Sequence, residues 1–196
     1  MISRVLALVA LLAPLVLAAC GKSPETKFLT LDPTQGSALA AYRGPPVRLP
    51  SLHIPPEFDR VEFARQTGPG EMKVDDFVHW SAPLGMLARN TLILDLAQRL
   101  PAGAVSPPDA AAQPGGLRAN VSILSFGVVG NEASLKAAYD FVLDDTPGAS
   151  GPQHWAELST ASVGPTPLET ARAFSTLLGL LADRMAGDIA LRPGRR

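Results

Sequence analysis

The chain has 196 residues, with 17 basic and 18 acidic side chains and a formal net charge of −1 at pH 7. This charge balance lacks the excess of basic residues that is typical of a nucleic-acid-binding domain, so nucleic acid is not a predicted partner. The sequence holds one cysteine, which excludes an internal disulfide framework, and stability must therefore come from buried apolar surface.

The first nineteen residues have the composition of an export signal. Arg4 precedes an apolar stretch from Val5 to Leu17, and two alanines then lead to Cys20. The stretch is shorter than the roughly 20 residues of a transmembrane helix, which favours a removable signal over a permanent membrane span. We predict a signal peptide at 1–19, a lipidated cysteine with its tether at 20–26, a folded domain at 27–191 and a basic tail at 192–196.

The cysteine ends the sequence Leu17-Ala18-Ala19-Cys20, which resembles the lipobox of bacterial lipoproteins. This resemblance implies that the Cys20 thiol receives a diacylglyceryl group, that the chain is cut before it, and that its new amino terminus takes a further acyl chain such as palmitate. A lone secreted cysteine could instead be a free thiol or form an intermolecular disulfide. Its position at the end of an export signal favours lipidation.

Short strands are predicted in the first part of the mature chain. Residues 27–31 form the first strand, and residues 47–54 form a second, with Pro50 at an edge or a bulge. The apolar spacing over residues 58–66 fits either helix or strand. A turn at 68–70 is followed by a further strand at 71–74.

A helix is predicted over residues 83–100, with Ser81 as its N-cap and a proline in its first turn. The helix has an apolar stripe at Leu92, Ile93, Leu96, Ala97 and Leu100. Three polar side chains are predicted to face away from the core: Asp95, Gln98 and Arg99.

The second half of the chain is predicted to hold a β-meander and a second helix. Residues 101–116 predict a long mobile loop, after which residues 117–129 and 132–143 alternate as a hairpin and 153–163 add a third strand. The capping box Thr166-Pro167-Leu168-Glu169 opens a helix that runs to about Leu191. The apolar face of this helix consists of Ala171, Phe174, Leu178, Leu181 and Met185. The predicted fold class is α/β: a single domain with a mixed β-sheet and two main amphipathic helices packed on it.

Catalytic and metal-binding patterns are weak in this sequence. His53, His79 and His154 lack the i,i+3 or i,i+4 spacing of a metal-binding helix, and the strained elbow G-x-S-x-G does not occur. The adjacent carboxylates Asp75-Asp76 and Asp144-Asp145 do not form a cation cage on extended backbone, and the second pair is interpreted as part of a turn. We therefore predict no catalytic residue, no metal site, no cofactor and no enzymatic activity.

The two tryptophans, Trp80 and Trp155, allow two interpretations. Tryptophan is enriched at binding hot spots, so either residue could anchor a partner. Large apolar side chains in a chain with few aromatic residues are more simply explained by packing in or beside the core.

Two sequence blocks, together with the lipobox, resemble the ABC-type transport auxiliary lipoprotein family. The family has a "P-x-x-L-D-R-x-x-I-V-x-R" stretch followed by "R-W-A-E-P-L" at the start of a helix. The first block is matched here by Pro55, Phe58, Asp59, Arg60, Phe63, Ala64 and Arg65, and the second by Trp80, Pro83 and Leu84. These residues are candidates either for contacting a partner or for holding the fold.

The resemblance implies a non-enzymatic lipoprotein on the outer membrane, facing the periplasm. The implied partner is a periplasm-spanning MCE-domain protein of a system that moves phospholipids or related lipids between the two membranes. Gly21 is not the aspartate that commonly retains lipoproteins in the inner membrane, which favours outer-membrane sorting. A homo-oligomeric ring is also physically reasonable, because several weak contacts around a ring-shaped partner reinforce one another.

Two other functions stay open from the sequence. A stand-alone periplasmic lipid- or solute-binding lipoprotein would need an apolar cavity of roughly 300 Å³ or more. A hydrolase would need a serine and a histidine within about 3.2 Å of each other in a cleft.

Overall fold

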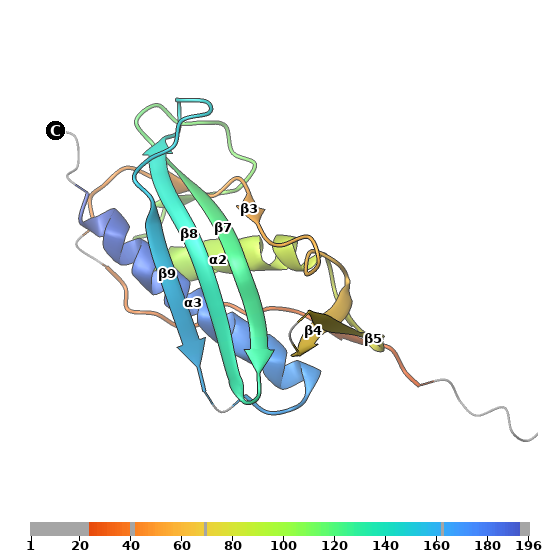
Figure 1. Ribbon diagram of the computed structural model, residues 1–196. Coiled ribbons are helices and arrows are strands. Elements are labelled where there is room, and N and C mark those ends of the chain that lie inside the picture. The colour runs from red at the N-terminus through yellow and green to blue at the C-terminus, as the bar shows by residue number, and fades with distance from the viewer. Residues whose placement is uncertain (1–23, 40–41, 69, 162, 193–196) are drawn as a thin grey trace, which may run out of the picture.

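The computed structural model describes residues 24–39, 42–68, 70–161 and 163–192 (Figure 1). The predicted signal peptide, Cys20 and the last four residues of the basic tail lie outside these residues. Figure 1 shows two helices, α2 (Leu84–Arg99) and α3 (Pro167–Ala190), crossing behind a large sheet, with a small sheet at one end of the molecule. The core lies between the large sheet and the helices.

The large sheet has six strands in the part of the chain that the structure describes. Its main strands form an antiparallel meander, which confirms the predicted hairpin and third strand: β7 (Leu117–Val129), β8 (Glu132–Leu143) and β9 (His154–Thr160). Three short strands add parallel pairing on the β7 side: β2 (Val47–Arg48), β3 (Leu52–His53) and β6 (Val105–Ser106).

The short parallel strands differ from the elements predicted in their place. The predicted strand over 47–54 is two separate strands, because the chain leaves extended pairing around Pro50, which has no N–H to donate to a sheet. The predicted loop at 101–116 contains β6, which pairs with β2.

The small sheet has the order β1-β5-β4 and projects at one end of the fold (Figure 1). It consists of β1 (Lys27–Leu29), β4 (Glu62–Gly68) and β5 (Glu71–Trp80). The ambiguous segment 58–66 is thus a turn followed by a strand. The predicted strand at 71–74 extends to Trp80.

Helix α3 has the predicted start and the predicted buried face. The Thr166 hydroxyl accepts a hydrogen bond from the Glu169 N–H, and the Glu169 carboxylate accepts one from the Thr166 N–H, so the capping box is confirmed. All five residues of its predicted apolar face are buried: Ala171, Phe174, Leu178, Leu181 and Met185.

Helix α2 departs from three predictions, one of which concerns its apolar stripe, because Ala97 is exposed. Its N-cap position is Pro83 rather than Ser81, and no side chain at that position caps the helix. The prediction that Asp95 and Arg99 face away from the core is wrong, since both are fully buried. The reason is that α3 and the segment after β1 cover this side of α2, and the buried charges satisfy one another there.

The predicted α/β class, a single domain with two helices packed on β-structure, is confirmed. The strands are divided between two mixed sheets. Among the described residues, neither helix combines the length and the apolar character needed to cross a bilayer.

Candidate functional site

The two sequence blocks that carry the family resemblance meet in the structure. The first block begins with a tight turn, in which the Pro55 carbonyl accepts hydrogen bonds from the N–H groups of Phe58 (2.9 Å) and Asp59 (3.2 Å). The second block is the end of β5 and the start of α2. We call the place where they meet the motif junction, defined by residues 55–60 and 80–85.

Asp59 supplies the cap that the start of α2 lacks. Its Oδ1 accepts a hydrogen bond from the Gly85 N–H at 3.0 Å, and the Arg60 carbonyl accepts one from the Leu84 N–H at 3.3 Å. Both donors belong to the first turn of the helix, whose N–H groups have no partner within the helix. A Cβ on Gly85 would lie 2.8 Å from Asp59 Oδ1, so the close approach depends on glycine at this position.

Trp80 lies inside the core at the motif junction. Its side chain is only 3% exposed, and its ring centroid is 5.5 Å from that of Phe63 and 6.4 Å from that of Phe174. The Phe174 ring stacks in turn on Phe126 of the large sheet. Trp80 therefore joins the small sheet to α3 and, through α3, to the large sheet.

The remaining candidate residues divide between the core and the surface. Leu84 is buried and Pro55 and Phe58 are half-buried, whereas Pro83 and Arg65 are exposed. Arg60 Nε donates to Glu62 Oε2 at 2.9 Å, and this hydrogen bond lowers the pKa of the Glu62 carboxyl. Arg65 differs from Arg60 in its position. It is exposed on β4, where it pairs with Lys73 of β5.

We expect Asp59→Ala to reduce the free energy of unfolding by about 1 kcal/mol, because the Gly85 N–H loses its cap. Asp59→Asn retains the accepting oxygen and should lose less. Glu57→Ala removes an exposed carboxylate from the same turn and should change stability by less than about 0.5 kcal/mol. Urea denaturation of the mature chain measures all three variants, and an equal cost for Asp59→Ala and Glu57→Ala would contradict the capping role.

A buried polar cluster that the sequence analysis missed lies between α2, α3 and the segment after β1. Arg99 Nε donates to Asp183 Oδ1 at 2.6 Å, and its Nη1 donates to the carbonyls of Asp95 (2.9 Å) and Thr34 (3.2 Å). Asp95 Oδ1 accepts the Thr34 N–H at 2.7 Å. Burial raises the pKa of the Asp95 carboxyl, against the opposing effects of Thr34 and Arg99. The i,i+4 spacing of Asp95 and Arg99 was the available sequence signal.

An ion pair joins β2 to the residue that follows β8. Arg48 Nε donates to Asp144 Oδ2 at 2.9 Å, which lowers the pKa of the buried Asp144 carboxyl. This ion pair gives Asp144 a tertiary contact in addition to its predicted place at a turn.

His154 lies in a histidine–aspartate–tyrosine contact. Its Nδ1 is 2.9 Å from Asp188 Oδ2, and the Tyr139 hydroxyl donates to the same oxygen at 2.6 Å. Burial and this hydrogen bond raise the pKa of the Tyr139 hydroxyl. The partners tie β8 and β9 to α3, and they differ from the serine–histidine pair that a hydrolase would need.

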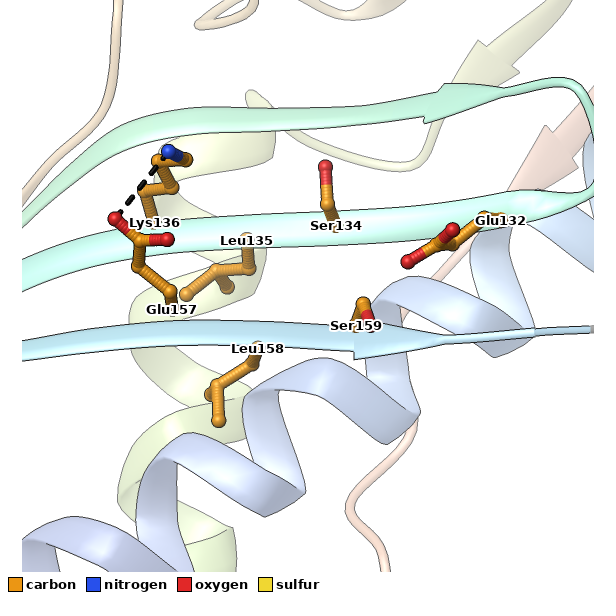
Figure 2. Close-up of a pocket in the computed structure, with 7 residues that line it drawn as sticks. All are labelled: Glu132, Ser134, Leu135, Lys136, Glu157, Leu158 and Ser159. Atoms are coloured by element: carbon orange, nitrogen blue, oxygen red, sulfur yellow. Dashed lines mark hydrogen bonds and ion pairs between the residues drawn. The ribbon is translucent and has the colours of Figure 1, made fainter.

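A shallow depression of about 350 Å³ lies over β8 and β9 (Figure 2). Its wall carries the ion pair of Lys136 and Glu157, with Nζ and Oε1 3.3 Å apart, and the hydroxyls of Ser134 and Ser159. Leu135 and Leu158 complete the lining, so the depression mixes polar and apolar groups and lacks the predominantly apolar walls of an acyl-chain site. Within the described residues, no group of three or more His, Cys, Asp or Glu side chains is placed to hold a metal ion.

The structure corrects the interpretation of one tryptophan. Trp80 packs in the core as expected, but Trp155 is 63% exposed on β9. Side chains alternate between the two faces along β9, so Trp155 and the buried Ala156 point to different faces of the sheet. The face that carries Trp155 is the one that α3 does not cover.

Comparisons with known proteins agree with this fold. The model of the ABC-type transport auxiliary lipoprotein component family matches residues 29–186. No curated protein sequence matches the chain. A crystal structure of an uncharacterized protein is similar at a TM-score of 0.66 and 16% identity, covering 85% of this chain and 99% of that one.

Two further solved structures are similar to the chain. A Xanthomonas campestris protein of family DUF330 has a TM-score of 0.63 and 11% identity, over 82% of this chain and 93% of its own. PelC from Paraburkholderia phytofirmans, solved as a dodecamer, has a TM-score of 0.41 and 14% identity, over 84% and 99%.

Proposed function

The chain belongs to the ABC-type transport auxiliary lipoprotein family, and we propose that it is the membrane-anchored docking subunit of a lipid transport system. In this proposal Cys20 carries the acyl chains, and the folded domain faces the periplasm from the outer membrane. The domain binds an MCE-domain protein that spans the periplasm and conducts phospholipids between the membranes.

The lipobox is the observation that carries the proposal. Each buried methylene contributes about 0.8 kcal/mol, so one acyl chain holds a protein only marginally whereas two or three hold it stably. A cysteine that takes a diacylglyceryl group and a further acyl chain meets this requirement. Gly21 in place of aspartate supports sorting to the outer membrane.

The contacts of the polar side chains support a binding role rather than catalysis. Asp59 caps a helix, Arg99 holds two helices and the segment after β1 together, and His154 pairs with Asp188. These groups are engaged in the fold, which supports binding through the surface of the domain. A ring of several copies around the partner would add weak contacts through effective concentration.

The stand-alone lipid-binding alternative is less well supported. The depression over β8 and β9 is lined by Leu135 and Leu158 together with charged and hydroxyl side chains, whereas an acyl chain needs predominantly apolar walls. A purified protein that retained one lipid molecule per chain, without its partner, would favour this alternative.

The proposed anchor is tested by expressing the full chain and Cys20→Ser in a Gram-negative host. We expect the wild-type chain in the outer-membrane fraction, an acylated Cys20-Gly21-Lys22 peptide by mass spectrometry, and co-isolation of an MCE-domain protein. Cys20→Ser should leave the outer-membrane fraction, and Gly21→Asp should move the protein to the inner membrane. Cys20→Ser that stays in the outer membrane would contradict the anchor.

A further inference from the structure

An apolar surface lies on the small sheet and on Val61, which directly precedes β4 and borders the motif junction. We call it the hairpin patch and define it by Phe28, Val61, Met72, Val74 and Phe77. Phe28 is 68% exposed and the other four side chains are between 37% and 42% exposed. Apolar side chains gathered in this way on a small projecting sheet indicate a surface that something covers.

The outer part of the β4–β5 hairpin, where residues 64–66 pair with residues 72–74, is amphipathic. Val74 pairs with Ala64 and Met72 pairs with Gln66, so these apolar side chains share one face. Lys73 pairs with Arg65 on the opposite face. Like charges directly opposite each other destabilise a strand pair, and that cost is offset either by nearby phosphate groups or by the carboxylates of Glu71, Asp75 and Asp76 on the same strand as Lys73.

Phe28 lies beside the hairpin, on the strand closest in sequence to the anchor. It pairs with His79, and the two ring centroids are 5.9 Å apart. Figure 1 shows the start of the described chain leaving the fold at the end where β4 and β5 lie. The eight residues from Cys20 to Phe28 can span at most about 28 Å. A bilayer that holds Cys20 is therefore within reach of the hairpin patch.

We propose that the hairpin patch lies in the headgroup region of the phospholipid bilayer that holds the acyl chains of Cys20. This inference rests on the proposed lipidation and deepens it, because it fixes the orientation of the domain. The apolar side chains enter the boundary between headgroups and acyl chains, and Arg65 and Lys73 contact headgroup phosphates. The short tether favours a phospholipid surface over a second copy of the chain as the covering partner.

The test places the photocrosslinker benzoylphenylalanine at position 28, at position 74 or at position 155. Trp155 is a matched control, since it is a large side chain of similar exposure on the other sheet. Each full-length protein is purified from the membrane and reconstituted in vesicles of phosphatidylethanolamine and phosphatidylglycerol. We expect protein–lipid adducts at positions 28 and 74 to exceed those at position 155 roughly tenfold. Thermal unfolding confirms that each variant is folded.

A second arm separates this inference from the proposed lipidation. The chain beginning at Cys20 is coupled through its only thiol to a maleimide lipid in the same vesicles. If lipid adducts at positions 28 and 74 form in this arm but not with the protein purified from the membrane, the hairpin contact is supported and the predicted lipidation of Cys20 in the cell is wrong. Equal adduct yields at all three positions in both arms, or chain-to-chain crosslinks at position 28 in place of lipid adducts, would overturn the inference.

Discussion

Replacing Arg99 with methionine is expected to lower the free energy of unfolding by about 3–5 kcal/mol, because it leaves a buried carboxylate without its cation. Arg99 is 1% exposed and contacts Asp95, Asp183 and Thr34. Methionine fills most of the volume but can donate to none of them. Asp183 is half-exposed and can be solvated, so the main cost comes from Asp95, which is fully buried.

The loss should depend on pH in a defined direction. Burial already raises the pKa of the Asp95 carboxyl, and Arg99 opposes this effect. Without Arg99 the folded-state pKa of Asp95 rises further above the value of about 3.9 in the unfolded chain. The folded variant then binds a proton that the unfolded chain releases, so its deficit grows as the pH rises from 4 towards neutrality.

A second substitution tests the cause of the loss. Asp95→Asn keeps the oxygen that accepts the Thr34 N–H and removes the charge, so Arg99→Met with Asp95→Asn should be more stable at pH 7 than Arg99→Met alone. Arg172→Ala, at an exposed position on α3, is the control and should cost less than about 0.5 kcal/mol. Urea denaturation at several pH values measures these differences. A deficit that is independent of pH and unaffected by Asp95→Asn would contradict the stranded-charge explanation.

Local signals predicted much of the secondary structure. The alternation over residues 117–143 and the capping box at Thr166 each depend on residues close in sequence, and both elements occur as expected. The apolar face of α3 followed from helical periodicity alone. For the candidate site, the family motif correctly selected positions that lie together, although it did not show what they contact.

Long-range contacts explain where prediction from the sequence stopped. The cap of α2 is Asp59, which lies 26 residues before Gly85, so a search for a cap next to the helix selects Ser81 instead. From the local sequence Arg99 resembles a surface residue, because its partner Asp183 lies 84 residues later in the chain. The hairpin patch was not predicted either, because exposure of Met72 and Val74 depends on β5 projecting beyond the core.

Replacing Trp80 with alanine should also cost about 3–5 kcal/mol, because a large cavity opens where the small sheet meets α3. The indole lies between Phe63 and Phe174, and Phe174 stacks on Phe126 at a centroid distance of 3.8 Å. Loss of the indole removes aromatic contacts with β4 and α3 at once. Trp80→Phe retains part of the aromatic packing and should cost less.

The two tryptophans allow a matched comparison of packing and partner binding. Trp155→Ala removes the same side chain from an exposed position and should change stability by less than about 0.5 kcal/mol. Urea denaturation followed by circular dichroism measures both variants without depending on tryptophan fluorescence. If Trp80 only stabilises the fold, each variant should lose partner co-isolation in proportion to its loss of stability, with Trp80→Ala losing more than Trp80→Phe. A Trp80→Phe protein as stable as wild type that no longer bound its partner would show instead that this position contacts the partner directly.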